Sequence, residues 1–314
     1  MAKEVESIIV GIDVSKAELE VFRSDTGETL SIDNEPKAVR RLLKSLPSNV
    51  RIALEPTGRH HQLLVGLALD LEIAVYLISG LQLNRYREAV GPRAKTDAAD
   101  AQLLARFLDR EGKDLRPVTL RSAEEQRLWQ LLRRRACVVH ARTAMMQSLK
   151  ELDGSDRESK RMLDTVKRFI DLLERRAIEV ARSLGWQEEL ARAQSVPGIG
   201  PLSALAMVLT FHHAPFSKAD AFIAFLGLDV RVRDSGTMRG KRRLTKQGEP
   251  ESRRLLFLAG RNARIHTDRF KSYFENMISR GFHNVAADVA ISRKLARIVF
   301  SLLKNERTYD PDFA

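Results

Sequence analysis

Short apolar runs in the first third of the chain predict the strands of a sheet. The β-branched run at 7–13 predicts a strand that is buried on both faces. Alternating apolar residues at 17–23 and a second run at 29–33 flank the turn-forming segment SDTGE, which predicts a hairpin that continues the sheet. The apolar runs at 50–55 and 73–79 predict two further buried strands.

Prolines help to place helices between these strands. Apolar residues recur at helical spacing after Pro36 until Pro47 ends the pattern, which predicts one helix. Pro56 follows a predicted strand and suits the first turn of the next helix. The resulting order is three strands, helix, strand, helix, strand, helix. It predicts a mixed α/β sheet with antiparallel strands on one side and crossover helices elsewhere, as in ribonuclease H-like domains.

Long helices are predicted in the rest of the chain. Apolar residues recur every three or four positions through 121–190, and the polar segment at 153–159 divides them into two runs, which predicts an antiparallel helical hairpin. The remainder, 195–314, is helical in pattern with a basic, loop-rich interruption. We therefore expect an α/β domain, a helical spacer and a mainly helical domain, with bounds 1–116, 117–192 and 193–314.

The charge balance favours a polyanionic partner. Lys and Arg number 53 against 41 acidic residues, for a net charge of +12, which points first to nucleic acid. The basic run Arg133, Arg134 and Arg135 falls partly on the outer face of the predicted hairpin, where it is either a solvated face or a nucleic-acid contact. The lone Cys137 excludes an internal disulfide and fits a reducing cytoplasm. No apolar run in the sequence reaches the roughly 18 residues typical of a membrane-spanning helix, so we expect none.

Four acidic residues occupy the positions where a site would form in such a sheet. Asp13 closes the first strand and Glu55 closes the strand at 50–55, and parallel neighbours bring their carboxyl ends to one edge. Asp97 and Asp100 lie three residues apart behind the predicted N-cap Thr96, so they share a helix face.

Oxygen ligands of this kind suit Mg²⁺ or Mn²⁺. Clustered carboxylates repel one another, and a divalent cation removes that penalty. Each acid also has an ordinary interpretation when it is taken singly. Asp13 could be a turn residue at a strand end, Glu55 a solvated strand end, and Asp97 and Asp100 favourable charges at a helix N-terminus.

Ser235 is the single serine of residues 231–248, which belong to a strongly basic segment. Residues 231–254 contain nine Lys or Arg against three acidic residues. Ser235 is either a small polar turn residue in the tripeptide DSG or a nucleophile aimed at phosphate, with neighbouring cations to hold that phosphate. Gly236 and Gly240 would let the backbone approach DNA closely. The candidate nucleic-acid contacts are Arg231, Arg233, Arg239, Lys241, Arg242, Arg243 and Lys246.

Two further glycines, Gly198 and Gly200, lie in the segment VPGIGP before an apolar helical run. The segment resembles the hairpin of helix-hairpin-helix units, in which backbone amides at a helix N-terminus bind a DNA phosphate. A tight interhelical turn that needs glycine explains the same residues, and the sequence leaves both interpretations open.

These segments together resemble one protein family. GIDVSK, ALEPTG and KTDAADA look like the acidic tetrad of the insertion-sequence transposases with a RuvC-like amino-terminal domain. That family includes the Piv-type DNA invertases and the bridge-RNA-guided recombinases. SVPGIGPLSALAMVL, FIAFLGLDVRVRDSG, RGKRRLTKQG and SRRLLFLAGRNA resemble its carboxy-terminal transposase domain, in the same order. One departure is local: only Thr237 and Met238 separate SG from RG, which leaves the match of the loop cations open.

The resemblance implies metal ligands at Asp13, Glu55, Asp97 and Asp100 and a serine nucleophile at Ser235. It also implies donor and target DNA as substrates, a structured non-coding guide RNA, and homodimers that assemble into tetramers in the cytoplasm. The expected reaction is DNA cleavage and rejoining through a phosphoserine intermediate. A metal-dependent RuvC-like nuclease or junction resolvase without a covalent intermediate is the alternative, since it needs only the tetrad.

Overall fold

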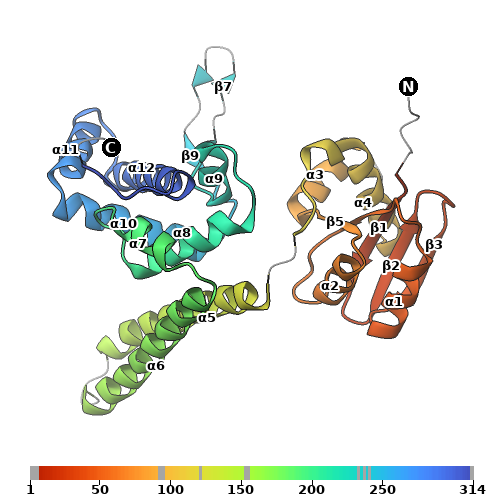
Figure 1. The fold of residues 1–314 in the computed structure, drawn as a ribbon, viewed down its shortest axis with the longest axis horizontal. Coiled ribbons are helices and arrows are strands. Elements are labelled where there is room, and N and C mark those ends of the chain that lie inside the picture. The colour runs from red at the N-terminus through yellow and green to blue at the C-terminus, as the bar shows by residue number, and fades with distance from the viewer. Residues whose placement is uncertain are drawn as a thin grey trace. The chain divides into compact units, whose positions relative to one another are not determined.

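The computed structural model describes residues 7–90, 96–119, 122–151, 156–231, 234–235, 238–239 and 242–311. The chain divides into two compact units, Met1–Leu120 and Arg121–Ala314, which the ribbon in Figure 1 shows with their elements labelled. The helical hairpin therefore belongs to the second unit. The expected division of that unit at residue 192 stays a prediction.

A five-stranded mixed sheet forms the centre of the first unit. Its strands are β1 (Ile9–Val14), β2 (Glu18–Arg23), β3 (Thr29–Asp33), β4 (Arg51–Leu54) and β5 (Ala74–Leu77). They lie in the order β3-β2-β1-β4-β5, with β1, β4 and β5 parallel and the other two pairings antiparallel. All five predicted strands are confirmed, and the sheet has the mixed, ribonuclease H-like arrangement that the sequence predicts.

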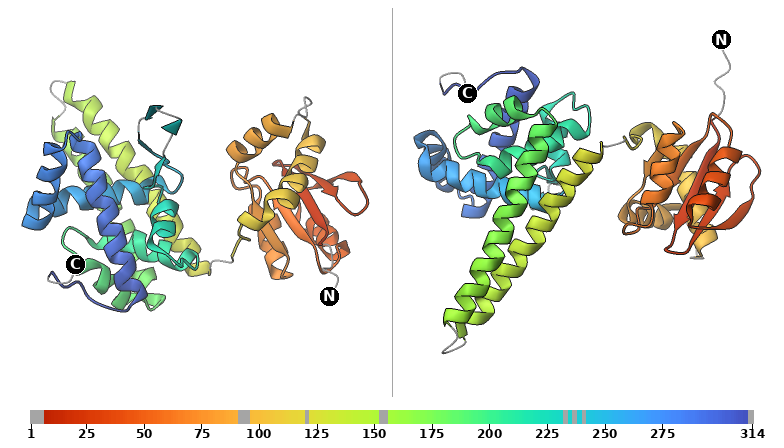
Figure 2. Two further views of the ribbon diagram at one scale, coloured as in Figure 1. Left: turned by 90° about the horizontal axis from the view of Figure 1, so that it is seen from above. Right: turned by 60° about the horizontal axis from the view of Figure 1, so that its bottom comes forward.

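Helices cover both faces of this sheet, as the two views of Figure 2 show. The four helices are α1 (Pro36–Ser45), α2 (Gln62–Asp70), α3 (Gly80–Val90) and α4 (Asp97–Glu111). Because side chains alternate between the faces of a strand, successive β1 residues enter different cores. Val10 and Ile12 pack with residues of α1 and α2, whereas Ile9 packs with residues of α3 and α4. The β1 strand is thus buried from both sides.

The helix expected to start at Pro56 begins later. The first residue of α2 is Gln62, preceded by a turn that includes Gly58 at φ +52. A residue in the left-handed region interrupts a right-handed helix, so Pro56 belongs to the loop after β4. The prediction was wrong because proline suits a loop as well as a helix start.

The second unit is helical. Its helices are α5 (Ala123–Ser148), α6 (Asp156–Ser183), α7 (Gln187–Gln194), α8 (Pro201–His213), α9 (Ala219–Phe225), α10 (Pro250–His266), α11 (Asp268–Ser279) and α12 (Asn284–Lys304). The predicted hairpin is confirmed in α5 and α6, which pack along each other in both figures. Short 3-10 turns follow α4 and α5, at Gly112–Asp114 and Leu149–Glu151. In the described part of the chain, every helix is too short or too polar to cross a membrane.

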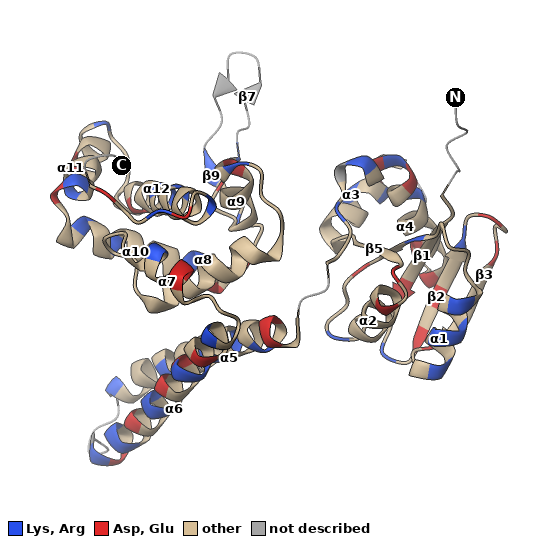
Figure 3. Cartoon of the chain, viewed as in Figure 1, with Lys and Arg blue, Asp and Glu red and all other residues tan. Residues whose placement is uncertain are grey.

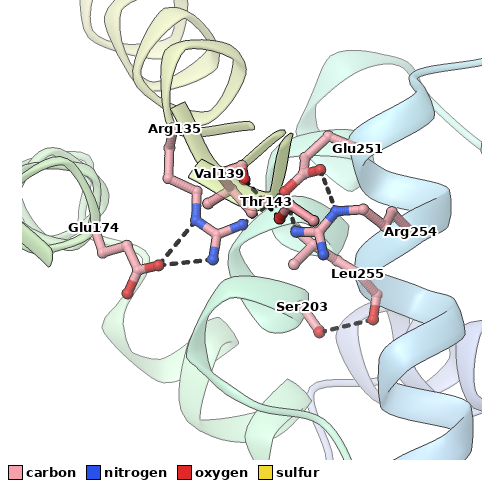
Figure 4. Close-up of polar contacts among 8 residues, drawn as sticks. All are labelled: Arg135, Val139, Thr143, Glu174, Ser203, Glu251, Arg254 and Leu255. Atoms are coloured by element: carbon pink, nitrogen blue, oxygen red, sulfur yellow. Dashed lines mark hydrogen bonds and ion pairs between the residues drawn. The ribbon is translucent and has the colours of Figure 1, made fainter. Parts of the chain in front are cut away.

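Arg135 corrects the expectation for the basic run on the hairpin. Arg133 and Arg134 are exposed, but the Arg135 side chain is only 12% exposed. It donates hydrogen bonds to Glu174 of α6 at 2.8 Å and to Glu251 of α10 at 2.9 Å. Figure 4 shows this arginine between the two carboxylates. Arg135 therefore fastens the hairpin to α10 and is not part of an outer basic face.

The basic interruption between α9 and α10 contains short paired strands. β6 (Val230–Arg231) pairs antiparallel with β9 (Arg243–Leu244), and β7 (Asp234–Ser235) pairs antiparallel with β8 (Met238–Arg239). Residues 230–244, here called the serine arm, thus contain two short antiparallel pairings, and Ser235 lies in the second. Figure 1 labels β7 and β9. Strands of two residues are too short to give a periodic signal, so the sequence predicted a loop.

Candidate active site

The carboxyl ends of β1 and β4 place two acids side by side. The parallel register pairs Ile12 with Leu54, so Asp13 and Glu55 are the next residues on neighbouring strands. Glu55 also lies against the first turn of α3, because a Cβ on Gly80 would be 2.4 Å from Glu55 Oε1. The two carboxylates therefore share one edge of the sheet, as the sequence predicts.

The other two acids are brought to this edge by the close seat of α4 on β1. A Cβ on Gly11 would lie 1.9 Å from the carbonyl oxygen of Ala101, so only glycine permits this approach. Thr96 is the N-cap, and its Oγ1 accepts a hydrogen bond from the Ala99 amide at 3.2 Å. Asp97 and Asp100 then occupy the first turn of α4, on the side of the sheet that carries Asp13.

The pKa of Asp13 indicates that the other three carboxylates lie near it. The pKa of Asp13 is raised to about 6, first by burial and then by the charges of Asp97, Asp100 and Glu55, against a hydrogen bond from the Val14 backbone that lowers it. A carboxyl whose pKa is raised by three carboxylates on two other elements lies close enough to feel each of them. Such a cluster favours a bound cation.

Arg87 is a member of this site that sequence reasoning missed. Its Nη2 donates to Asp100 Oδ1 at 2.5 Å, and the two side chains are only 16% and 14% exposed. Asn84 Oδ1 accepts a second hydrogen bond from Arg87. Nothing in the sequence distinguishes Arg87 from Arg85, two residues earlier on the same helix, because the choice depends on how α3 faces α4.

The four carboxylates are the right type of ligand for a divalent cation. Their side chains are not arranged around a common point in this structure. Four carboxylates supply the hard oxygen ligands that Mg²⁺ and Mn²⁺ prefer. Among the described residues, however, no three His, Cys, Asp or Glu side chains are arranged to hold one ion. Asp100 Oδ1 is paired with Arg87, so one of the two oxygens of this carboxylate is already engaged.

The candidate nucleic-acid residues of the second unit are only partly described. Arg231 and Arg243 face each other across the base of the serine arm, and Arg242, Arg243 and Lys246 are exposed. Arg239 lies on β8 opposite β7. Arg233, Gly236, Gly240 and Lys241 fall outside the described residues, as do the side chains of Ser235 and Arg239. The structure thus places the arm and leaves the role of Ser235 a prediction.

The two glycines of VPGIGP differ in their surroundings. Gly198 has φ +90, and a Cβ there would lie 2.6 Å from Ala263 Cβ and 2.7 Å from the Ala259 carbonyl oxygen of α10. Gly200 is the N-cap of α8, with ordinary backbone angles and open space where a Cβ would be. Close packing thus accounts for Gly198, whereas Gly200 leaves room for a phosphate at the start of a helix.

We expect Gly198→Ala to destabilise the second unit by about 2–4 kcal/mol, from backbone strain and overpacking. In a domain of this size that lowers Tm by about 4–16 °C. Gly200→Ala should cost only about 0.5–1 kcal/mol, because alanine is a poorer N-cap than glycine, and it should lower DNA affinity, because its methyl group would obstruct a phosphate. Thermal unfolding and fluorescence anisotropy with labelled DNA measure the two effects. If a folded Gly200→Ala protein bound DNA as the wild type does, the segment VPGIGP would be a structural turn and not a phosphate contact.

Comparison with known proteins identifies both halves of the chain. Residues 10–152 match the DEDD transposase family model of IS110, and residues 190–275 match the model described as transposase, IS116/IS110/IS902 family. A probable family 20 transposase of Pseudomonas aeruginosa is 27% identical over 96% of this chain and 98% of its own length. The pilin gene-inverting protein of Moraxella bovis is 22% identical over 96% and 97%.

Two other proteins are similar to parts of the chain. The transposase for insertion sequence element IS1111A of Coxiella burnetii is 28% identical over 77% of this chain and 74% of its own. The solved structure of T. thermophilus RuvC in complex with a Holliday junction substrate aligns with 36% of this chain and 100% of its own, at 15% identity and a TM-score of 0.27. With both family domains present in order and relatives matched end to end, this chain belongs to the IS116/IS110/IS902 family of transposases, enzymes of DNA recombination.

Proposed function

We propose that this transposase cuts and rejoins DNA through a covalent bond between Ser235 and a DNA phosphate. The Ser235 hydroxyl oxygen attacks the phosphorus and forms a serine–phosphate ester, the bond from phosphorus to one deoxyribose oxygen breaks, and the serine proton is balanced by protonation of that oxygen, which leaves as a hydroxyl. A deoxyribose hydroxyl then attacks the phosphoserine and restores the serine. The phosphodiester bond energy is conserved, so strands are exchanged without ATP. The observation that supports the proposal is the proximity of Asp13 and Glu55 at one edge of the sheet, with Asp97 and Asp100 near enough to raise the pKa of Asp13.

The four acids would hold Mg²⁺ or Mn²⁺ at the edge of the sheet. When bound, such an ion supplies Lewis-acid stabilisation of the charge that develops on phosphate oxygens. The chain itself supplies the ligands, and α4 holds two of them on its first turn. Arg87 balances the charge of Asp100. The cations of the serine arm would hold the phosphate near Ser235.

The partners follow from the family and the charge. We propose donor and target DNA as substrates, supported by relatives described as a transposase and as a gene-inverting protein. A net charge of +12 supports binding of a polyanion. A structured non-coding RNA as guide, assembly of homodimers into tetramers, and a location in the cytoplasm with the nucleoid complete the proposal and rest on the family resemblance.

Trapping a protein–DNA adduct tests the serine. The full chain is incubated with donor and target DNA, Mg²⁺ and candidate RNA, then denatured and separated. We expect a DNA-bound protein band that Ser235→Ala lowers by 10³-fold or more, on the order of losses seen for other nucleophiles. Ser279→Ala is the matched control, because this exposed serine only donates to the Asn276 carbonyl of its own helix. It should form the adduct at the wild-type level.

The same experiment separates the alternative reaction. The tetrad alone would suffice for a RuvC-like nuclease or junction resolvase, which hydrolyses the phosphodiester and leaves no adduct. Nicked DNA that persists at the wild-type rate in Ser235→Ala would support that reading and exclude the phosphoserine route. Loss of both nicking and the adduct in Asp13→Asn would show that each step depends on the tetrad.

A further inference from the structure

A groove lies at the base of the serine arm, between β6, β9 and the start of α12. It encloses about 410 Å³. Its apolar wall includes Leu244, Met277 and Phe282, and the Phe282 and Val285 side chains are 43% and 54% exposed. Large apolar side chains left this open beside a strongly basic segment point to a ligand with both an apolar and an anionic part.

The rim of this groove is positively charged. Arg242, Arg243 and Arg293 line it, together with His283. No acidic residue is among the described residues that line it. The guanidinium of Arg280 lies 5.6 Å from the Phe282 ring centroid, which adds a cation at the aromatic wall. Figure 3 shows Lys and Arg at the base of the arm and along the facing part of α12.

Arg293 carries a donor without a partner beside the groove. Its Nε is buried and has no hydrogen-bond partner among the described residues. A buried donor without a partner costs free energy, and because this atom is not exposed in the groove, a ligand would satisfy it only if the side chain turned toward the groove. Arginine also presents paired N–H groups that match phosphate and base edges.

We propose that this groove binds an unstacked nucleotide of the DNA strand next to the phosphate that Ser235 attacks. The base would stack on Phe282 among the apolar residues, and its phosphate would lie on the arginine rim. The inference rests on the proposed function and adds a binding site for the substrate. An intact duplex hides its bases, so the groove selects a strand that is locally opened at the cleavage site.

The serine arm keeps this groove within reach of the reaction. Arg231 pairs with Arg243 at the groove, and Ser235 follows Arg231 by four residues. A fully extended chain covers at most about 14 Å over that length, which equals about four base steps of DNA. An opened base in the groove therefore belongs to the nucleotides that flank the attacked phosphate.

Photo-crosslinking tests the groove without any need for cleavage. Single-stranded oligodeoxynucleotides that carry 5-iododeoxyuridine are irradiated with the full-length Ser235→Ala protein, and the crosslinked peptide is identified by mass spectrometry. We expect the crosslink at Phe282. Phe282→Ala should remove it and weaken binding about tenfold, as stacking on an aromatic side chain predicts. Phe169→Ala is the matched control, because Phe169 is 48% exposed on α6, away from the groove.

Further measurements identify which ligand occupies the groove. Arg293→Ala should weaken binding and reduce its salt dependence, whereas Phe282→Leu should weaken binding with the salt dependence unchanged. Equal crosslinking of a fully paired duplex at Phe282 would overturn the unstacked base. Crosslinking only by a 5-iodouridine RNA would overturn the DNA assignment. If Phe282→Ala abolished self-association of the protein while DNA still crosslinked at another residue, the groove would be assigned to a second copy of the chain. Because Ser235 is already absent, none of these outcomes depends on the phosphoserine step.

Discussion

Substituting Gly11 by alanine is expected to displace α4 from its close seat on β1 and to lower the rate of DNA cleavage strongly. The new Cβ would meet the Ala101 carbonyl oxygen at 1.9 Å and the Ala105 amide nitrogen at 2.7 Å, and both are backbone atoms that a side-chain rotation cannot move. Helix α4 must then shift, and with it Asp97 and Asp100. We expect a loss of about 3 kcal/mol in stability and of about 10²-fold or more in cleavage, because a shift of about 1 Å suffices for that.

Gly66→Ala is the matched control in the same unit. Gly66 lies inside α2 with open space where a Cβ would be, so alanine should raise stability by about 0.5–1 kcal/mol. Circular dichroism on heating gives the stability of both proteins, and calorimetric titration with Mn²⁺ reports whether the acids still act together. Wild-type melting and wild-type Mn²⁺ binding by Gly11→Ala would show that the close seat of α4 does not position the tetrad.

The sheet was predictable because each strand carries its own signal. The runs at 7–13 and 50–55 are continuous and apolar, which is typical of strands that are covered on both sides, and the structure buries Val10, Ile12 and Ile52 completely. The start of α4 was predictable for a similar local reason, since Thr96 caps its own helix. The start of α2 was not predictable, because Pro56 restricts the backbone only locally and does not determine the conformation of the five residues before Gln62.

The acids were predictable as a set and not as a geometry. Strand order brings Asp13 and Glu55 together, and helical spacing places Asp97 and Asp100 on one face of α4, whereas the close seat of α4 on Gly11 brings the two pairs to one edge. The direction of each carboxylate depends on its neighbours in space. Arg87 forms an ion pair with Asp100, and no sequence pattern along α3 indicates this pairing. The groove is hidden for the same reason, since Leu244 and Phe282 are distant in sequence and meet only through packing.

Helix α10 starts directly after the basic segment and is fastened by one buried carboxylate. Glu251, in its first turn, accepts from Arg135 of α5 at 2.9 Å and from Arg254 at 2.7 Å, as Figure 4 shows. Glu188 forms an ion pair with Arg192 over the same distance, 2.9 Å. The two differ in exposure, because the Glu251 side chain is 8% exposed and that of Glu188 is 83% exposed. By distance alone the two ion pairs would be expected to affect stability equally, whereas their burial predicts a much larger loss when Glu251 is removed.

Glu251→Ala is therefore expected to cost about 3 kcal/mol, since it leaves the mostly buried Arg135 with one carboxylate in place of two. The corresponding fall in Tm is about 6–12 °C for a unit of this size. Glu188→Ala should cost less than about 1 kcal/mol, because water already solvates its carboxylate. Thermal unfolding of the two variants, followed at the second unit, compares them directly. Equal shifts would mean that the hairpin does not depend on Glu251, and the serine arm would then need another anchor at the start of α10.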